Sequence, residues 1–364
     1  MPLAEQFICH SFFNKIIHLL LRNATPDILV TGGTGFIGSY LLRYLVQNGY
    51  TRIRALRRPN SKMDMVAEIQ DKIEWVECDL LDVLGLEEAM EGIRYVYHCA
   101  ALVSMNRRDA GRLIEVNREG TANMVNWSLE KGVEKFLHVS SIAAIGHNKH
   151  TEFIDESCHW ERSGKLSYYA LSKYQAEQEV WRGVAEGLNA VVVNPSVVLG
   201  SGRWKEGPLK LFKTALWQNP FYVKGVNGFV DVRDVARFMV AIMESEVSQE
   251  RFILSSGNYA FKEVQTMMAQ SLGKRAPWLA APTAGMHMAA LFGNLLAAIT
   301  RSEPLLTPEV VRHSTSISRF SNKKSLEVVS SFTYTPLQET IAEVCQQLQE
   351  VSKNGFDTRY LPFQ

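Results

Sequence analysis

Short apolar runs alternate with amphipathic helical patterns over the first two hundred residues. Runs rich in Val, Ile, Leu and aromatic residues occur at 27–31, 51–56, 73–78, 95–100, 135–140 and 190–194. Between them, apolar residues recur at helical spacing, most clearly at 36–47, 110–130 and 169–186. Apolar strands that alternate with helices are typical of a parallel sheet covered on both faces. The pattern therefore predicts an α/β protein with a doubly wound parallel sheet.

The alternation weakens after about residue 195, and Gly and Pro become frequent over 200–220. Residues 252–254 are consistent with one more strand, and 262–350 with helices joined by loops. We predict an extension at 1–26, a sheet domain at 27–199 and a smaller, mostly helical part at 200–364, with segments that return to the sheet near 225–256. Ligands of open α/β sheets bind at the carboxyl ends of the strands. The last part is therefore expected to form the substrate-binding side of a pocket there.

Two apolar stretches bear on membrane contact. Residues 12–21 have apolar positions at helical spacing, which predicts an appended amphipathic helix. A start of the sequence that is placed too far upstream is an alternative. A secretory signal is a further alternative, but Lys15 and His18 interrupt the apolar run. The stretch at 285–299 is too short for a bilayer about 30 Å thick. It is expected to be a lid or a buried helix, with membrane contact as the alternative, and no membrane span is predicted.

Composition narrows the classes of function. The formal charge is +1, from 39 basic and 38 acidic residues, so nothing in the charge points to a nucleic-acid partner. Five scattered cysteines form no CxxC pair and no cluster with histidine, so neither a disulfide framework nor a metal site is indicated. A reducing, cytoplasmic setting is expected on this ground.

A glycine-rich turn follows the first predicted strand. It reads TGGTGFIG over 31–38, with Gly32, Gly35 and Gly38 at the spacing of a dinucleotide-binding turn. Glycine takes positive φ without steric cost and lets the backbone approach a pyrophosphate. The helix that begins near Phe36 and Ile37 offers N–H groups and the positive end of its dipole. A strand before and a helix after the turn favour a Rossmann dinucleotide site over a purely structural turn.

The end of the second strand bears on which dinucleotide binds. NAD sites usually carry an acidic residue there for the ribose 2′-hydroxyl, whereas this chain has Arg57, Arg58 and Lys62 and no carboxylate. Guanidinium groups pair well with phosphate. We predict NADP(H) over NAD(H), which remains possible, and a solvated basic loop is the alternative.

Three tyrosines surround one lysine in SYYALSKYQAE over 167–177. Tyr169 lies four residues before Lys173, so the two share a helix face. A neighbouring ammonium favours the phenolate and is expected to lower the pKa of Tyr169 from its usual value near 10. Tyr168 has Ser172 at the equivalent position, and Tyr174 points elsewhere. Alone, this spacing is common by chance, so packing is the alternative.

Serines at the end of the fifth strand strengthen the case. Ser140 and Ser141 stand at the carboxyl end of a predicted central strand, where ligands bind. A hydroxyl at that place can donate to a carbonyl oxygen. The glycine turn predicts a bound cofactor, and the serine hydroxyl predicts a donor to a carbonyl oxygen. Both would lie near the Tyr169–Lys173 pair.

The chain resembles the extended short-chain dehydrogenase/reductase superfamily, and most of all its dihydroflavonol-reductase-like and epimerase/dehydratase-like group. The resemblance extends from residue 28 to about 344. The motifs that carry it, in family order, are TGGTGFIG (31–38), CDLLD (78–82), HCAA (98–101), VNREGT (116–121), HVSSIAAIG (138–146), YALSK (169–173), VNPSVVLG (193–200) and FVDVRDVA (229–236).

The resemblance implies roles for individual residues. Tyr169 would be the general acid/base, Lys173 would hold the nicotinamide ribose, and Ser141 would be the family serine. The other implied cofactor contacts are Asp79 and Leu80 at the adenine, Ala100 and Ala101 after the fourth strand, and Pro195 and Ser196, with Asn194, at the nicotinamide. Alternatives stay open: Asp79 capping a turn, Pro195 ending a strand, and the matched Asn117 acting structurally rather than in a proton relay.

Three functions fit this scaffold. The first is NADPH-dependent reduction of a ketone or aldehyde, or the reverse oxidation. The second is a nucleotide-sugar epimerase or dehydratase with retained NAD, and the third is a non-catalytic NADP sensor. Asn227 stands where sugar-nucleotide enzymes usually carry an arginine, and Arg57 and Arg58 disfavour a retained NAD. Sensors of this fold typically lose the tyrosine or the lysine, so the reductase is favoured.

The region after residue 200 is rich in aromatic residues and methionine, which favours an apolar small-molecule substrate, although core packing accounts for many of them. Members of the superfamily often pair two long helices of each subunit. The resemblance therefore implies a homodimer through the helices predicted at 110–130 and 169–186.

Overall fold

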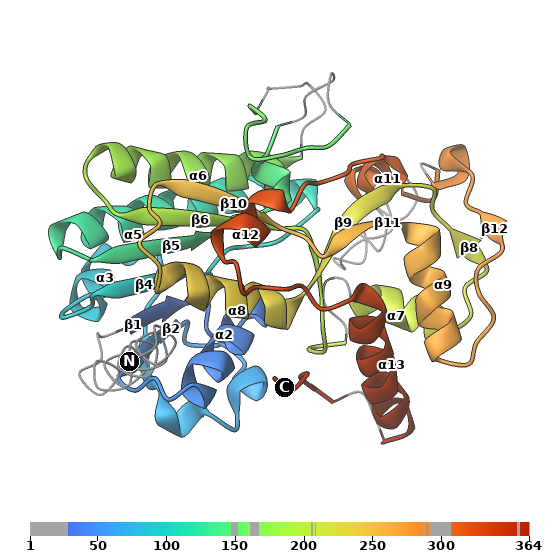
Figure 1. Cartoon of the computed structure of the whole chain (residues 1–364), viewed down its shortest axis with the longest axis horizontal. Helices are drawn as coiled ribbons and strands as arrows, with labels where there is room; N and C mark the ends of the chain where they lie inside the picture. The colour runs from blue at the N-terminus through green and yellow to red at the C-terminus, as the bar shows by residue number, and fades with distance from the viewer. Residues whose placement is uncertain are drawn as a thin grey trace, which may run out of the picture.

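A seven-stranded parallel sheet forms the centre of the computed structural model (Figure 1). The structure describes residues 28–146, 152–160, 167–204, 207, 209–286, 288–290, 307–354 and 357–363. The predicted helix at 1–26 and most of the stretch at 285–299 lie outside these residues. The strands run in the order β10-β6-β5-β4-β1-β2-β3, which confirms the predicted doubly wound sheet. Their bounds are β1 Ile28–Thr31, β2 Ile53–Arg57, β3 Glu74–Glu77, β4 Tyr95–His98, β5 Lys135–Val139, β6 Ala190–Pro195 and β10 Glu250–Leu254.

Helices cover both faces of this sheet. One face carries α2 (Phe36–Gln47) and α8 (Val232–Met243), and the other carries α3 (Val83–Ala89), α5 (Gly120–Glu130) and α6 (Tyr168–Ala185) (Figure 1). Strand residues alternate between the two cores: Ile28 and Val30 pack with the first face, Leu29 with the second. This period of two is what a strand buried on both faces requires.

The predicted helix at 110–130 is three pieces rather than one. Helix α4 (Ala110–Ile114) passes into one π-helical turn, η4 (Glu115–Glu119), before α5 begins at Gly120. A π turn admits one extra residue per turn and re-aims the side chains within it. Here it faces α6 and turns Asn117 inward. Single 3₁₀ turns are η1 (Asp64–Val66), η2 (Gln70–Lys72), η3 (Arg107–Asp109) and η5 (Ile142–Ala144).

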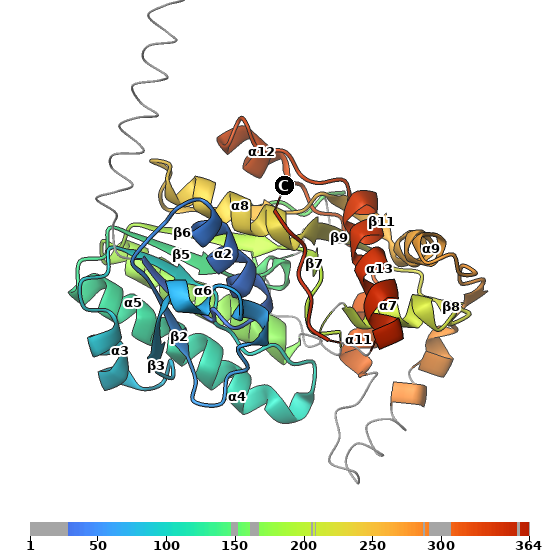
Figure 2. The same ribbon diagram turned by 90° about the horizontal axis from the view of Figure 1, so that it is seen from below.

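The rest of the chain builds a smaller part beside the sheet (Figures 1 and 2). Of the segments near 225–256, β10 joins the main sheet beside β6, whereas β9 instead forms a three-stranded sheet with β7 and β11. The remaining elements are mostly helices, as predicted. The bounds are β7 Val197–Leu199, α7 Leu209–Leu216, β8 Phe221–Tyr222, β9 Val226–Asp231, β11 Gly257–Ala260, α9 Phe261–Ser271, β12 Leu279–Ala280, α11 Pro308–Thr315, α12 Lys323–Val328 and α13 Leu337–Asn354.

The two parts share contacts, and the division at residue 199 stays a prediction. The segment 357–363 returns to α2, where Phe363 packs on Tyr40 and Tyr44 and the Leu361 N–H donates to the Tyr40 hydroxyl at 2.6 Å. In the described part of the chain, no helix is long and apolar enough to cross a bilayer.

Candidate active site

The predicted site residues gather at the carboxyl ends of four neighbouring strands. The glycine turn follows β1, Ala100 and Ala101 follow β4, Ser140 and Ser141 follow β5, and Pro195 ends β6. This is the edge at which open α/β sheets bind their ligands. Helix α6 carries Tyr169 and Lys173 to the same edge, beside the end of β5.

The glycine turn is shaped so closely that side chains are excluded. Gly32 has a φ of +68°, and a Cβ on it would lie 2.7 Å from the Ala100 nitrogen. A Cβ on Gly38 would lie 2.2 Å from the Gly32 carbonyl oxygen. Among the described residues no side chain caps Gly35, so the first N–H groups of α2, at Phe36 and Ile37, are left for a ligand. The backbone therefore fits the pyrophosphate of a dinucleotide.

The loop after β2 carries the predicted cations. The Arg57 guanidinium pairs with Glu77 at 3.1 Å, and Arg58 is exposed. Sequence reasoning missed Arg203, whose Nη2 donates to the carbonyls of Thr34 at 3.2 Å and Lys62 at 3.0 Å. Arg203 thus ties the glycine turn to the cationic loop. It lies about 140 residues further along the chain, and no local pattern pointed to it.

The acidic motif after β3 makes a turn. Asp79 accepts from the Leu81 N–H at 3.0 Å through Oδ1, which is the turn-capping role that the sequence left open. Leu80 is buried against α5, because a Cβ on Gly120 would lie 2.9 Å from the Cβ of Leu80. Contacts of Asp79 and Leu80 with an adenine remain predictions.

A chain of hydrogen bonds joins the ends of β1 and β4 to the π turn. Thr31 Oγ1 accepts from the Ala100 N–H at 3.1 Å. The same hydroxyl donates to His98 Nδ1 at 2.8 Å. His98 Nε2 lies 3.0 Å from Thr121 Oγ1, which itself donates to the Asn117 carbonyl. His98 is therefore a neutral Nε2–H tautomer, and burial lowers its pKa to about 3. His98 is therefore a packed residue of the strand end.

The side chains of Tyr169 and Ser141 lie close enough to interact. Ser141 Oγ accepts from the Ala143 N–H at 3.1 Å, which fixes the hydroxyl at the start of η5. Burial raises the pKa of Tyr169, and the interaction with Ser141 lowers it by less. The expectation that Lys173 lowers this pKa is not what the structure shows, because desolvation dominates.

Lys173 is almost wholly buried at the base of the site. Its Nζ donates to the Val139 carbonyl at 2.7 Å, at the end of β5. Burial lowers the pKa of Lys173 to about 8, and Glu177 opposes that shift. Tyr169 and Lys173 thus lie on one side of α6, and the Lys173 ammonium is held against the end of β5.

The other two tyrosines of the motif point elsewhere. Tyr168 is half-exposed, with the Arg107 guanidinium 6.0 Å from its ring centroid. Tyr174 stacks on Trp160, with ring centroids 4.1 Å apart and planes 7° apart. The choice of Tyr169 as the catalytic tyrosine stays a prediction.

Asn117 uses its amide on the protein itself. Nδ2 donates to the Leu102 carbonyl and to Ser172 Oγ, both at 2.9 Å, and Oδ1 accepts from the Leu102 N–H at 2.7 Å. These bonds fasten the segment after β4 to α6, one residue before Lys173. They match the structural role that the sequence left open for Asn117.

The nicotinamide-side residues are linked to Ser141. Asn194 Nδ2 donates to the Ser141 carbonyl at 3.0 Å. Pro195 and Ser196 are buried at the end of β6, and Ser196 Oγ has no hydrogen-bond partner among the described residues. A contact of Ser196 with a cofactor stays a prediction.

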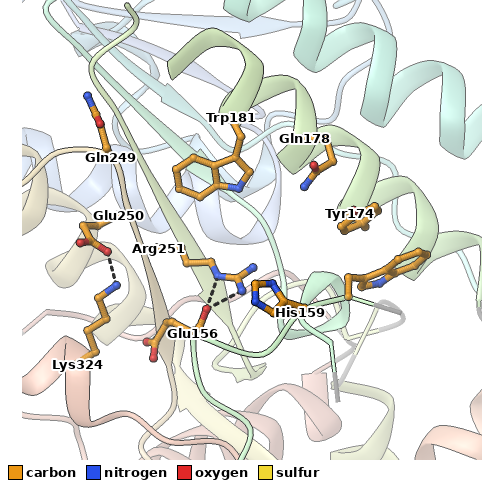
Figure 3. A pocket seen from close by; sticks show the side chains of 10 residues that line it. Glu156, His159, Tyr174, Gln178, Trp181, Gln249, Glu250, Arg251 and Lys324 are labelled. Atoms are coloured by element: carbon orange, nitrogen blue, oxygen red, sulfur yellow. Dashed lines mark hydrogen bonds and ion pairs between the residues drawn. The ribbon is translucent and has the colours of Figure 1, made fainter. Parts of the chain in front are cut away.

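A cleft of about 430 Å³ lies beside α6 and the edge strand β10 (Figure 3). Tyr174, Gln178 and Trp181 line it from α6, together with Arg251 of β10. None of the predicted site residues is among its lining. Of the aromatic residues expected to shape a substrate pocket, Trp204 and Phe212 are buried in the core instead.

The sequence of the sheet and its strand ends is shared with a known family. Residues 28–254 match the model of the NAD dependent epimerase/dehydratase family. The chain belongs to this family. The match confirms the resemblance to extended short-chain dehydrogenases/reductases, and with it an NAD(P)-dependent oxidoreductase.

Relatives within the epimerase/dehydratase family include several reductases. A putative dihydroflavonol 4-reductase of Synechocystis sp. is 33% identical over 68% of this chain and 73% of its own length. Sterol demethylase protein B of Methylococcus capsulatus is 30% identical over 79% of this chain and 86% of its own. Cinnamoyl-CoA reductase 1 of Petunia hybrida is 26% identical over 91% of this chain and 94% of its own length.

Solved structures of this family show the same fold. The protein named gox2253 superposes with a TM-score of 0.77 at 30% identity, over 91% of this chain and 99% of that one. A UDP-glucose 4-epimerase of Thermotoga maritima superposes with a TM-score of 0.73 at 21% identity, over 90% and 99%. The second likeness, at its low identity, concerns the fold alone.

Proposed function

We propose that this chain reduces a ketone or aldehyde on an apolar small molecule, with NADPH as the preferred cofactor. The observation that carries the proposal is that Ser141, Tyr169 and the buried Lys173 lie together at the strand edge that also holds the glycine turn. Bound there, a nicotinamide cofactor supplies the hydride for the carbonyl carbon. The reductases among the relatives support the same reaction, and the sterol demethylase name supports an apolar substrate.

Each residue has a part that follows from its place. Ser141 Oγ donates to the substrate carbonyl oxygen and polarises it. The Tyr169 hydroxyl gives its proton to that oxygen as negative charge develops there. In its protonated form Lys173 binds the hydroxyls of the nicotinamide ribose. Desolvation keeps Tyr169 protonated near neutral pH, which suits a proton donor in the direction of reduction.

A screen of carbonyl compounds tests this proposal. NADPH or NADH is supplied with a panel of aldehydes and ketones, apolar ones included, and cofactor oxidation is followed. We expect turnover with NADPH and at least one ketone or aldehyde. A separate arm with UDP-sugars tests the epimerase alternative, and sugar isomerisation without net cofactor oxidation would contradict the reductase.

The residue that speaks against the epimerase alternative is Asn227, which lies on β9. Its amide oxygen accepts from the Gly228 N–H at 2.8 Å.

The preference for NADP(H) is testable at Arg57 and Arg58. Replacing both with alanine is expected to weaken NADPH binding by about a hundredfold to ten-thousandfold, because each of the two charge-assisted bonds to a phosphate contributes about 1.5–3 kcal/mol. NADH binding should stay within about threefold, since it has no 2′-phosphate. Equilibrium titration of both cofactors measures this. The matched control is Glu77→Gln, which frees Arg57 from its ion pair and should not weaken NADPH binding. Equal affinities of the wild type for both cofactors would refute the preference.

We also propose a homodimer that pairs α5 and α6 with their copies. Light scattering of the purified protein should give the mass of two chains. A single-chain mass at micromolar concentration would contradict it.

A further inference from the structure

A carboxylate lies buried one helical turn beyond Lys173. Glu177 is on α6, four residues after Lys173 and eight after Tyr169, and is only 1% exposed. An ionised carboxylate in such a place needs donors on both oxygens, or it becomes neutral. The proposed mechanism so far gives this side chain no part.

Four donors from four places converge on Glu177. Oε2 accepts from Ser140 Oγ at 2.8 Å and from Asn194 Nδ2 at 3.0 Å. Oε1 accepts from Arg251 Nη1 at 3.1 Å and from Trp181 Nε1 at 3.2 Å. The carboxylate therefore joins the carboxyl ends of β5 and β6 and the edge strand β10 to the helix of the catalytic pair. Ser140 directly precedes Ser141, and Asn194 also bonds to the Ser141 carbonyl.

Arg251 extends this bridge to a segment outside the sheet. Its Nε and Nη2 donate to the Glu156 carbonyl at 2.9 and 2.6 Å, and Nη2 also donates to the Cys158 carbonyl at 3.0 Å (Figure 3). That segment backs the loop that starts at Ser141, because a Cβ on Gly146 would lie 1.6 Å from the His159 carbonyl oxygen. The guanidinium thus braces the serine loop from behind.

Glu177 also acts on the charge of Lys173, which lies four residues before it on the same helix. The groups that face Lys173 are His98 and Cys99 from the end of β4, His138 from β5, and Glu177 from its own helix. Burial lowers the pKa of both histidines, to about 3 for His98, and raises that of the Cys99 thiol to about 12. These three are neutral at pH 7. Among the described residues around this lysine, Glu177 supplies the negative charge.

We propose that Glu177, held by Arg251, is a positioning residue that keeps Ser141 and Lys173 in their catalytic arrangement and balances the charge of Lys173. The inference rests on the proposed carbonyl reduction and gives Glu177 a positioning role at that same site. Trp181 and Arg251, which both donate to Glu177, also line the cleft beside α6 (Figure 3).

The test is the pH dependence of a variant that keeps the shape of the side chain. Glu177→Gln removes the negative charge, so the pKa of Lys173 should fall below its value of about 8. The rate of the wild type should decline above about pH 8, as Lys173 loses its proton. In Glu177→Gln this decline should begin at lower pH, and kcat should drop at least tenfold at pH 8 but less at pH 6. A deficit that is the same at every pH would contradict the charge role.

A second variant changes the sign of the electrostatic effect. Arg251→Met removes a cation and leaves Glu177 with three donors, so the decline should occur at the wild-type pH or above it. Looser packing alone would move both variants in the same direction, which would overturn the proposal. The matched control is Glu186→Gln on the same helix, where an exposed carboxylate pairs with Arg182 at 2.7 Å. It should leave the profile unchanged. Circular dichroism and thermal melting confirm that each variant is folded.

A direct titration of Lys173 separates this inference from the proposed function. Lysines labelled with ¹³C at Cε are followed by NMR across pH, and Lys173→Arg assigns the signal. A lower pKa in Glu177→Gln supports the counter-charge even if no carbonyl substrate is found. An unchanged pKa, together with normal reduction by the wild type, would refute the positioning role and leave the proposed function intact.

Discussion

Replacing Tyr169 with phenylalanine should lower the rate of carbonyl reduction by about a hundredfold to ten-thousandfold, the contribution typical of a general acid. The ring keeps its packing, and only the hydroxyl that meets Ser141 is lost. NADPH binding should change by less than about threefold, because the glycine turn and Lys173 are untouched. Single-turnover rates and fluorescence titration of NADPH measure the two quantities separately.

Two neighbouring tyrosines provide the controls for Tyr169. Tyr168→Phe removes a half-exposed hydroxyl, and Tyr174→Phe keeps the stack on Trp160. Both should retain nearly full activity. Surviving turnover in Tyr169→Phe would show that another group supplies the proton.

The second large effect is expected at Gly38. In Gly38→Ala the new Cβ would lie 2.2 Å from the Gly32 carbonyl oxygen, so the turn or the start of α2 must move. Overpacking of this kind costs about 1–3 kcal/mol, and it falls on the backbone that should cradle the pyrophosphate. NADPH affinity should drop at least tenfold, and the melting temperature should fall. Titration of NADPH and calorimetry measure these changes.

Gly111 is the matched control for Gly38. It lies in α4, where a Cβ would meet no atom within 4 Å. Gly111→Ala should therefore raise stability by about 0.5–1 kcal/mol, because alanine loses less backbone entropy in a helix. NADPH affinity should not change. Equal losses in both variants would show that the turn is not the cofactor cradle.

Local patterns in the sequence predict much of the sheet and part of the site. Each of the six predicted strands and the strand at 252–254 occurs, because a strand buried on both faces leaves a continuous apolar run. The glycine turn and the shared face of Tyr169 and Lys173 are also local, with spacings of three to four residues. Such spacings follow directly from turn and helix geometry.

Features that depend on distant partners could not be predicted in this way. Glu177 and Arg251 are 74 residues apart, and nothing near either one indicates the ion pair. The helix expected at 110–130 contains a π turn, and Asn117 within it bonds to Leu102 and Ser172; apolar periodicity does not report such bonds. The pKa of Tyr169 is likewise expected from the sequence to be lowered by Lys173, but it is raised because the folded surroundings remove water from the phenol.

The place of β10 at the edge of the sheet has a consequence for folding during synthesis. The strand next to it, β6, ends at Pro195, but β10 begins only at Glu250. A ribosome must therefore add more than fifty residues after β6 before the sheet can be completed. Until then the edge of β6 is open, and Glu177 waits without the arginine that pairs with it. The nascent chain should thus acquire its cofactor cradle early and its fully braced catalytic helix late.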